Sequence, residues 1–218
     1  MIRLEHLSKT YRLDGSAKTV ARNITATFPT GVSVALLGRN GAGKSTLLRI
    51  IAGLEDPSDG RVVSTGTISW PVGFAGSFHP DLTGQQNIRF VGRIYGVDTD
   101  ELSEFVENFA GLGVHYRLPF RSYSSGMRSR LAFGLSMGIG FDTYLVDEIT
   151  AVGDALFRAR STEMFRDRMR RSGAIVVSHS MPQVREICTE AAVLEDGRLH
   201  YYTDLEAGIA HHERNMAA

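Results

Sequence analysis

A glycine-rich segment followed by a lysine and two hydroxyl residues is the stretch whose residue types and spacing best suit chemistry. It has the pattern G-x-x-x-x-G-K-[ST] and consists of Gly38, Arg39, Asn40, Gly41, Ala42, Gly43, Lys44, Ser45 and Thr46. In such a loop, successive backbone N–H groups face one anion, and the following helix adds its positive dipole end. Lys44 would contact the β- and γ-phosphates of a nucleotide, and the Ser45 hydroxyl would ligate Mg²⁺.

The flanks of this segment support a phosphate site. The apolar run at residues 32–37 predicts a buried strand before the loop, and residues 47–52 predict a helix after it, which Gly53 can end. A strand, a glycine-rich loop and a helix form the context that separates a phosphate site from a glycine-rich turn without a ligand. The sequence therefore predicts nucleotide binding at residues 38–46.

Acidic and imidazole side chains follow two further predicted strands. The strand at residues 143–146 delivers Asp147 and Glu148 at its carboxyl end, the edge at which open α/β sheets place their ligands. Asp147 is the expected second Mg²⁺ anchor, and Glu148 can orient or deprotonate an attacking water. His179 follows the strand at 174–177 and could donate a hydrogen bond to the γ-phosphate. The alternatives are two solvated acids and a structural histidine.

An aromatic residue precedes the phosphate loop. Tyr11 lies between strands predicted at residues 2–7 and 19–28. An aromatic ring can stack on a base without base-specific hydrogen bonds. Alone, such a residue more often packs in a protein interior. Because a phosphate loop follows, we favour stacking on the nucleotide base.

Composition limits the partners. The chain has 218 residues with 43% apolar content, enough for one large domain or two small ones, and its 24 basic and 24 acidic residues cancel. The arginines between residues 158 and 171 are interleaved with acids, which predicts a solvated helix face. We therefore expect no nucleic-acid partner. Cys188 is the single cysteine, which excludes an internal disulfide and favours a reducing compartment.

The middle of the chain differs in pattern from its ends. No strand pattern occurs at about residues 71–140, whereas a capping box at 83–86 and apolar spacing at 102–109 predict helices. A helical subdomain inserted in an α/β core is the expected organisation. No apolar run is long enough to span a membrane, and the first residues lack a signal-peptide core. We expect a soluble, cytoplasmic protein without direct membrane insertion.

The phosphate loop alone indicates nucleotide binding, and a second glycine-containing motif indicates which family of nucleotide-binding proteins the chain resembles. Tyr123, Ser124, Ser125, Gly126 and Met127 lead into a predicted helix that precedes Asp147 in the sequence. This motif resembles the signature of ABC-type ATPases, in which serine and glycine open a helix. The rest of the chain carries similar motifs in the family's order. They are Tyr11 for the aromatic loop, Asp147-Glu148 for the Walker B end, residues 151–154 for the D-loop and His179 for the switch histidine.

The resemblance covers essentially the whole chain and implies a fold and cofactors. The fold is α/β, a P-loop NTPase of the ABC type with a RecA-like core, an antiparallel β subdomain and an inserted helical subdomain. Residues 1–218 would form a single ABC ATPase domain that uses ATP and Mg²⁺. Glu148, His179 and Lys44 would be catalytic, and Ser45 and Asp147 would hold the metal. The nucleotide-binding residues would be Tyr11, Gly38, Asn40, Gly41, Ala42, Gly43, Lys44, Ser45, Thr46, Ser124, Ser125 and Gly126.

Departures from the usual motifs narrow the resemblance to one branch. Tyr123, Ser125 and Met127 replace the usual signature leucine, second glycine and glutamine, and no glutamine occurs at residues 74–76, where the family places one against Mg²⁺. These variants are similar to the branch that exports bacterial surface polysaccharides. A short polar tail is expected after a predicted hairpin near residues 192–200, so no C-terminal glycan-binding domain is expected. The chain most resembles the ATPase of a capsular polysaccharide exporter.

The resemblance also implies partners. Two copies would pair head-to-tail, so that Ser124 and Gly126 of one copy cap the γ-phosphate held by the other. The helical subdomain and the loop at 71–82 would dock an integral membrane permease of the ABC-2 type, at the cytoplasmic face of the inner membrane. The alternatives are export of another surface glycan (O-antigen or teichoic acid), a soluble non-transport ABC ATPase, and a P-loop kinase, which would not explain the signature.

Overall fold

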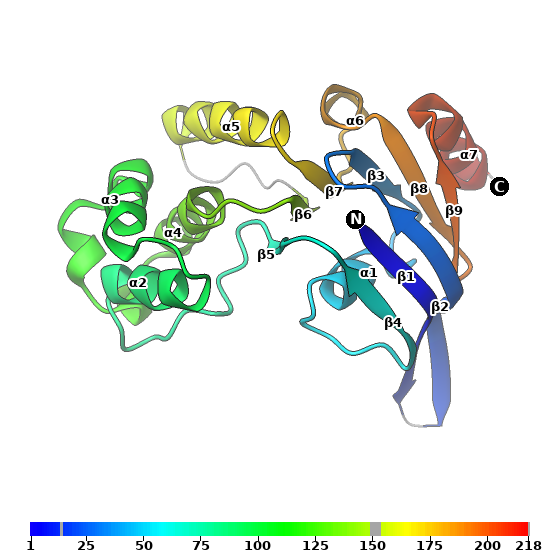
Figure 1. Ribbon diagram of the computed structural model, residues 1–218, viewed down its shortest axis with the longest axis horizontal. Helices are drawn as coiled ribbons and strands as arrows, with labels where there is room; N and C mark the ends of the chain where they lie inside the picture. The colour runs from blue at the N-terminus through cyan, green and yellow to red at the C-terminus, as the bar shows by residue number, and fades with distance from the viewer. Residues whose placement is uncertain (14, 149–153, 218) are drawn as a thin grey trace. The chain divides into compact units, whose positions relative to one another are not determined.

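The computed structural model describes residues 1–13, 15–148 and 154–217 (Figure 1). Its strands are β1 (Ile2–Leu13), β2 (Ser16–Phe28), β3 (Ser33–Leu37), β4 (Asp59–Ser64), β5 (Ile68–Pro71), β6 (Thr143–Asp147), β7 (Gly173–Val177), β8 (Glu190–Glu195) and β9 (Arg198–Tyr202). Its α-helices are α1 (Lys44–Ile51), α2 (Gly84–Ile94), α3 (Thr99–Ala110), α4 (Ser125–Gly138), α5 (Ala155–Met169), α6 (Met181–Ile187) and α7 (Leu205–Ala217). Short 3₁₀ turns lie at Gly113–Arg117 and Phe120–Ser122.

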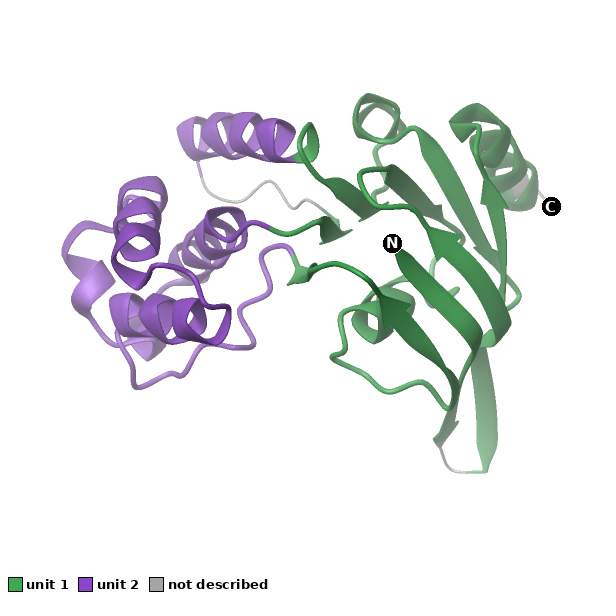
Figure 2. Ribbon diagram, viewed as in Figure 1, with its two compact units in different colours: residues 1–71, 141–149, 169–218 green, residues 72–140, 150–168 purple. Residues whose placement is uncertain are grey.

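The chain divides into two compact units (Figure 2). The first comprises Met1–Pro71, Phe141–Ile149 and Met169–Ala218, and it contains both sheets. The second comprises Val72–Gly140 and Thr150–Arg168, and it is helical. Helix α5 therefore joins the helical unit, although it lies outside the helical subdomain predicted at about 71–140. That the whole chain is one ATPase domain stays a prediction.

The larger sheet of the first unit brings distant loops to one edge. Its order is β5-β6-β7-β3-β8-β9, and all neighbours are parallel except β8 and β9. Strands β3 and β7 are buried along their whole length, as expected for parallel strands covered on both faces. Because β6, β7 and β3 are neighbours, the segments that follow them meet at the carboxyl edge of the sheet.

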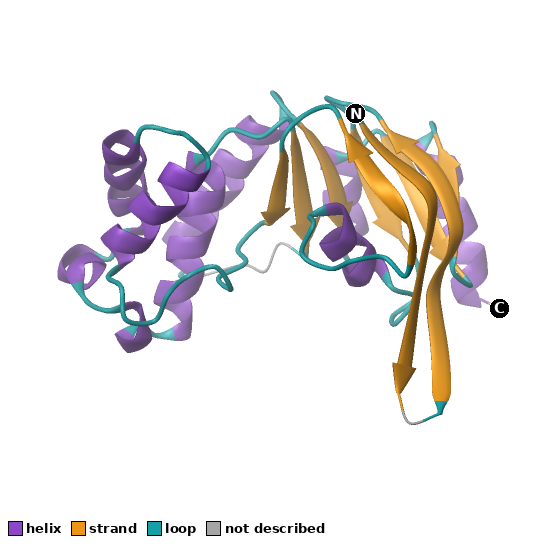
Figure 3. Cartoon of the chain, turned by 60° about the horizontal axis from the view of Figure 1, so that its bottom comes forward, coloured by secondary structure: helices purple, strands orange, loops and turns teal. Residues whose placement is uncertain are grey.

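The smaller sheet has the order β2-β1-β4 and is antiparallel. Ile2, Leu4 and Leu7 of β1 pack into one core with Leu47 and Leu48 of α1. Beyond the pair Ser8–Asp59, β1 is paired with β2 and continues as a long hairpin (Figure 3). The prediction that β1 ends at residue 7 and that Tyr11 lies between two strands was wrong. Tyr11 is part of β1, because backbone pairing with β2 continues past residue 7. The outer hairpin shows little apolar alternation, so the sequence pattern did not reveal these strand residues.

Helix starts and stops in the second unit follow sequence signals. The capping box is confirmed: Thr83 accepts from the Gln86 amide, and Gln86 accepts from the Thr83 amide. The Asp98 carboxylate caps α3 by accepting from the Asp100 and Glu101 amides, and Gly111 ends the helix in the left-handed conformation with φ 60°. Leu131 and Leu135 of α4 are buried. Helix α4 has its own N-cap, Ser124, and carries the predicted signature residues at its start.

Helix α5 carries most of the arginines that the sequence assigned to a solvated face. Arg158 is exposed, as predicted. The Arg160 guanidinium, however, lies 5.5 Å from the ring centroid of Phe109, and Arg168 donates a hydrogen bond to the Met137 carbonyl oxygen. Part of this arginine cluster therefore packs against α3 and α4 rather than facing solvent alone.

The residues after β9 form a helix, so the prediction of a short polar tail was wrong. Leu205 and Ile209 of α7 are one turn apart and buried, and α7 packs on β8. Most other residues of α7 are polar, which hid its short apolar stripe from sequence inspection. No helix among the described ranges is both long enough and apolar enough to cross a membrane.

The contact between α7 and β8 predicts a packing defect. A Cβ on Gly208 would lie 2.4 Å from the Cβ of Ala191, so Gly208→Val should displace α7. We expect the free energy of unfolding, measured by urea titration, to fall by about 1–3 kcal/mol. Ala207→Val is the matched control, because Ala207 is exposed on the same helix. An equal loss in both variants would contradict the proposed contact.

Candidate functional site

The loop after β3 is compressed between two strands, which explains its glycines. Gly43 has φ 107°, and a Cβ there would lie 2.8 Å from the Cβ of Val20 on β2. Gly38 has φ 153°, and a Cβ there would lie 2.5 Å from the carbonyl oxygen of Leu194 on β8. A larger residue at either position would push the loop away. Gly43 is also the N-cap of α1, so no side chain covers the first amides of that helix.

Lys44 is the first residue of α1, and its side chain folds back over the loop. Its Nζ donates to the carbonyl oxygens of Gly38 at 2.6 Å and Arg39 at 3.1 Å. Burial lowers the pKa of Lys44, and the carboxylates of Asp147 and Glu148 offset part of that shift. An anion in the loop would favour the charged ammonium for the same reason.

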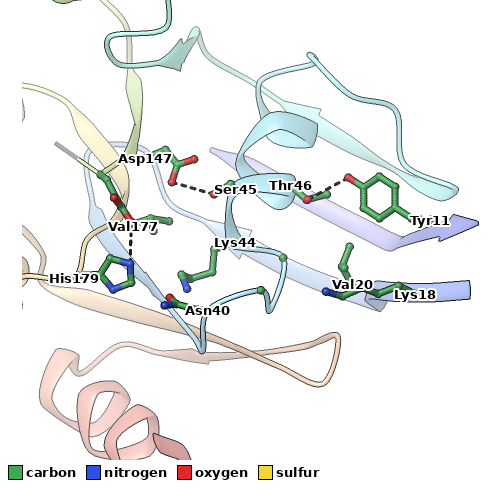
Figure 4. A pocket seen from close by; sticks show the side chains of 13 residues that line it. Tyr11, Lys18, Val20, Asn40, Lys44, Ser45, Thr46, Asp147, Val177 and His179 are labelled. Atoms are coloured by element: carbon green, nitrogen blue, oxygen red, sulfur yellow. Dashed lines mark hydrogen bonds and ion pairs between the residues drawn. The ribbon is translucent and has the colours of Figure 1, made fainter. Parts of the chain in front are cut away.

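A pocket of about 470 Å³ lies above the loop (Figure 4). Its walls come from β1 and β2, from the loop and the start of α1, and from the ends of β6 and β7. The predicted site residues that line it are Tyr11, Asn40, Gly41, Gly43, Lys44, Ser45, Thr46, Asp147, Glu148 and His179. Gly38 and Ala42 line an adjacent hollow behind the loop. All these residues belong to the first unit.

Ser45 and Asp147, the two residues predicted to hold Mg²⁺, meet in the lining of this pocket. The Ser45 hydroxyl donates to Asp147 Oδ1 at 3.2 Å (Figure 4). A hydroxyl and a carboxylate oxygen suit Mg²⁺, which prefers oxygen ligands and keeps several positions for water and phosphates. Within the described residues, no cluster of three or more histidine, cysteine or acidic side chains is arranged to hold a metal. These two side chains therefore fit a metal ion whose remaining ligands come from water and the phosphates of a nucleotide.

Glu148 and His179 form a close side-chain contact that sequence inspection did not anticipate. His179 Nε2 lies 2.8 Å from Glu148 Oε1, and both side chains remain more than half exposed, at 60% and 51%. Glu148 has φ 51°, a left-handed conformation that is costly for a residue with a side chain. Its amide donates to the Val177 carbonyl oxygen at 2.9 Å, which ties the ends of β6 and β7 together. Strain of this kind gathers at functional sites.

Tyr11 is held by an acid that sequence inspection missed. Its hydroxyl donates to Glu55 Oε1 at 2.5 Å and lies 3.2 Å from Thr46 Oγ1. Glu55 also pairs with Lys9 and Arg49, each at 3.0 Å. Burial raises the pKa of Glu55, but hydrogen bonds from Tyr11, Lys9 and Arg49 outweigh burial and lower it to about 2. Glu55 lies in turn-like sequence, where nothing distinguishes it from a solvated acid.

The predicted signature residues lie in the second unit. Ser124 is the N-cap of α4, and its hydroxyl oxygen accepts from the Met127 amide at 3.3 Å. A Cβ on Gly126 would meet no heavy atom within 4 Å. Ser124 and Gly126 share a hollow of about 290 Å³ with His115 and Arg130. Ser125, the first residue of α4, is exposed. The structure thus confirms that these residues open a helix, while their role stays a prediction.

Most of the predicted D-loop lies outside the described residues. Residues 151–153 belong to that part, so the D-loop is represented by Asp154. Asp154 accepts from the Phe157 amide at 2.9 Å and pairs with Arg130 at 2.9 Å. Asp154 thereby links the start of α5 to α4, within the second unit.

The Glu55 network predicts a pH-dependent stability. A folded-state pKa of about 2 lies below the ordinary carboxyl value of 4.5, so Glu55 stabilises the fold above pH 4.5, and this stabilisation is lost as the pH falls toward 2. Allowing for solvent screening, we expect wild type to lose about 1–2 kcal/mol more than Glu55→Gln over that range. Urea unfolding at several pH values measures this. Glu104→Gln, which changes an exposed acid of α3, is the control. If the free energy of unfolding depended on pH equally in wild type and Glu55→Gln, the stabilising role of Glu55 would be contradicted.

Comparisons with known sequences assign the chain to a family of ATP-binding proteins, as the phosphate loop suggests. The family model described as ABC transporter matches residues 21–151, more than half of the chain. The polysialic acid transport ATP-binding protein KpsT of Escherichia coli is 47% identical over 212 residues, covering 96% of this chain and 95% of that protein. The capsule polysaccharide export ATP-binding protein CtrD of Neisseria meningitidis is 45% identical, with 94% and 95% covered. The ATP-binding protein BexA of Haemophilus influenzae is 42% identical, with 99% and 100% covered.

Solved structures share the fold. The ATP-binding cassette MJ0796, in a dimeric post-hydrolysis state bound to ADP and Pi, matches with a TM-score of 0.74 at 20% identity, covering 92% of this chain and 97% of that one. An ATP-binding subunit of an ABC transporter matches with a TM-score of 0.75 at 18% identity over the full length of both. These likenesses confirm the predicted fold class. From the family match and the full-length relatives, the chain belongs to the ATP-binding proteins of the ABC transporter family.

Proposed function

We propose that this chain binds and hydrolyses Mg-ATP as the ATPase subunit of an exporter of capsular polysaccharide. One observation carries the ATPase part: a single pocket gathers the phosphate loop, the Ser45–Asp147 pair and the Glu148–His179 pair. The export part rests on KpsT, CtrD and BexA, two of which are named for transport of polysialic acid or capsule polysaccharide. An O-antigen export protein of Klebsiella pneumoniae is less similar, at 35% identity, which favours capsule over other glycans.

The binding roles follow from the side chains that face the pocket. Lys44 would exchange its bonds to the Gly38 and Arg39 carbonyls for bonds to the β- and γ-phosphates. Ser45 and Asp147 would hold Mg²⁺, which neutralises charge on the phosphates when bound. The free amides at the start of α1 would face the same anion. Tyr11, which Glu55 fixes at the pocket wall, would lie against the base.

Glu148 and His179 are the groups suited to handle the attacking water. The Glu148 carboxylate can accept a proton or a hydrogen bond from water. His179 lies within hydrogen-bond distance of that carboxylate and lines the same pocket, so it can hold the carboxylate in place and contact the γ-phosphate. The strained backbone at Glu148 aims the side chain into the pocket in this arrangement.

A second copy of the chain would complete the site. The start of α4 presents Ser124, Ser125 and the open position at Gly126, which suit a phosphate as a helix N-terminus does. We assign this surface to the nucleotide held by a partner copy. The dimeric state of the cassette MJ0796 supports the pairing.

The exposed apolar side chains of α2 support a membrane-protein partner. Phe90, Ile94 and Tyr95 are 52%, 64% and 43% exposed, and Phe74 in the preceding loop is 40% exposed. Apolar side chains grouped on a helix and its C-cap residue, Tyr95, suit a protein interface. We assign this surface to an ABC-2 type permease, which would place the ATPase peripherally at the cytoplasmic face of the inner membrane.

Replacement of Glu148 separates binding from turnover. Glu148→Gln should keep affinity for Mg-ATP and lower the rate of hydrolysis at least about 100-fold, because the amide cannot accept a proton. With ATP present, the dimer should accumulate and elute earlier in size-exclusion chromatography. Glu163→Gln, on the exposed surface of α5, is the control. A Glu148→Gln enzyme with wild-type turnover would exclude this role.

Loss of the gene tests the export assignment. Capsule polymer should remain inside a deletion strain, and copies carrying Lys44→Ala or Gly126→Asp should fail to restore surface polymer. A carboxylate at position 126 would face the partner's γ-phosphate as a like charge. Immunodetection of surface and internal polymer provides the measurement. Purified Gly126→Asp protein should still bind nucleotide as a monomer.

Two results would contradict these assignments separately. Normal surface polymer in the deletion strain would exclude capsule export and leave the ATPase intact. Loss of nucleotide binding by the Gly126→Asp monomer would exclude the assignment of the signature to a partner copy.

A further inference from the structure

Lys18 reaches the nucleotide pocket from the β1–β2 hairpin. It lies directly opposite Tyr11 in the antiparallel register, and both residues line the pocket (Figure 4). Residues opposite one another on paired strands project to the same face, and successive residues alternate between faces. The next pair, Arg12 and Ala17, therefore projects away from Tyr11 and Lys18. One hairpin face thus carries an aromatic ring and a cation side by side.

Strand β2 follows the phosphate loop with matching spacing. Val20 packs at Gly43, 2.8 Å from the position of a Cβ, and Lys18 Nζ lies 3.8 Å from the corresponding position at Gly41. A step of two residues along β2, from Val20 to Lys18, therefore matches a step of two residues along the loop, from Gly43 to Gly41. Val20 is 6% exposed, so its contact fixes the distance between the strand and the loop. Lys18 is held beside the loop as a consequence.

The Lys18 ammonium has no competing partner in the described part of the chain. No carboxylate there lies within ion-pair distance of it, and no group accepts a hydrogen bond from it. Lys9 on the same hairpin, in contrast, is engaged by Glu55, and Lys44 is engaged by carbonyls of the loop. A lysine is a flexible point charge that binds phosphate oxygens without demanding a fixed geometry.

We propose that Lys18 is a second phosphate-binding cation, which contacts the polyphosphate chain of the nucleotide across the pocket from Lys44. This inference rests on the nucleotide site proposed above and adds a residue outside its recognised motifs. The hairpin then binds both ends of the ligand, the base through Tyr11 and the phosphates through Lys18. Because Lys18 is exposed, its contribution is moderate and screened by salt.

Lys18→Gln tests the proposal by nucleotide binding to the full chain. We expect the Kd values of Mg-ATP and ADP to rise about threefold to tenfold at low ionic strength, with a smaller effect at high salt. Lys18→Arg should retain wild-type affinity. Arg12→Gln is the matched control, because it removes the same charge from the opposite face of the hairpin. The ratio of ATP to GTP affinity should not change, since both nucleotides carry the same phosphates.

Three outcomes would overturn the role of Lys18. They are wild-type affinity in Lys18→Gln, an equal loss in Arg12→Gln, and a changed preference between ATP and GTP. Lys44→Ala, measured in the same assay, separates this inference from the proposed function. If Lys44→Ala binds nucleotide as wild type does, the site itself is misplaced. If Lys44→Ala loses affinity while Lys18→Gln does not, the inference on Lys18 fails alone.

Discussion

The parallel pairing of β6, β7 and β3 is the constraint on which the site depends. Parallel neighbours end at the same edge of a sheet, so the phosphate loop, the Asp147–Glu148 pair and His179 meet there, although long stretches of chain separate them. The register of β6 with β7 runs to Asp147 and Val177, the last residue of each strand. A slip of one residue would send each side chain to the other face of the sheet. The geometry of this candidate site is therefore a consequence of strand register.

Close packing of the smaller sheet against the loop supplies one wall of the pocket, formed by β1 and β2. Gly43 lets Val20 approach the loop, and this contact brings the β1–β2 hairpin beside the glycine-rich loop. Glu55, from the turn after α1, then fixes Tyr11 through its hydroxyl. The Tyr11 side of the pocket therefore depends on small residues in the loop, because a bulkier loop would lift the hairpin and its aromatic ring together.

The sequence predicted the phosphate loop and the strand ends because their signals are local. Buried parallel strands appear as continuous apolar runs, and the residues at their ends are then assigned by position alone. Helix α7 was missed because its apolar stripe is short, and the outer hairpin because its strands are held by backbone bonds. The Glu148–His179 pair and the Glu55–Tyr11 bond depend on tertiary distances that no periodicity encodes. Local patterns thus located the residues, while their pairing required the fold.

The ends of β6 and β7 are joined by two contacts, so they are expected to move together. The Glu148 amide bonds to the Val177 carbonyl oxygen, and the Glu148 carboxylate bonds to His179, two residues farther along the same strand end. The left-handed backbone of Glu148 persists because both bonds hold it. A displacement of His179 must therefore carry the Glu148 carboxylate with it or break the pair. The positions of the His179 ring and the Glu148 carboxylate are in this way coupled through a single pair of adjacent strands.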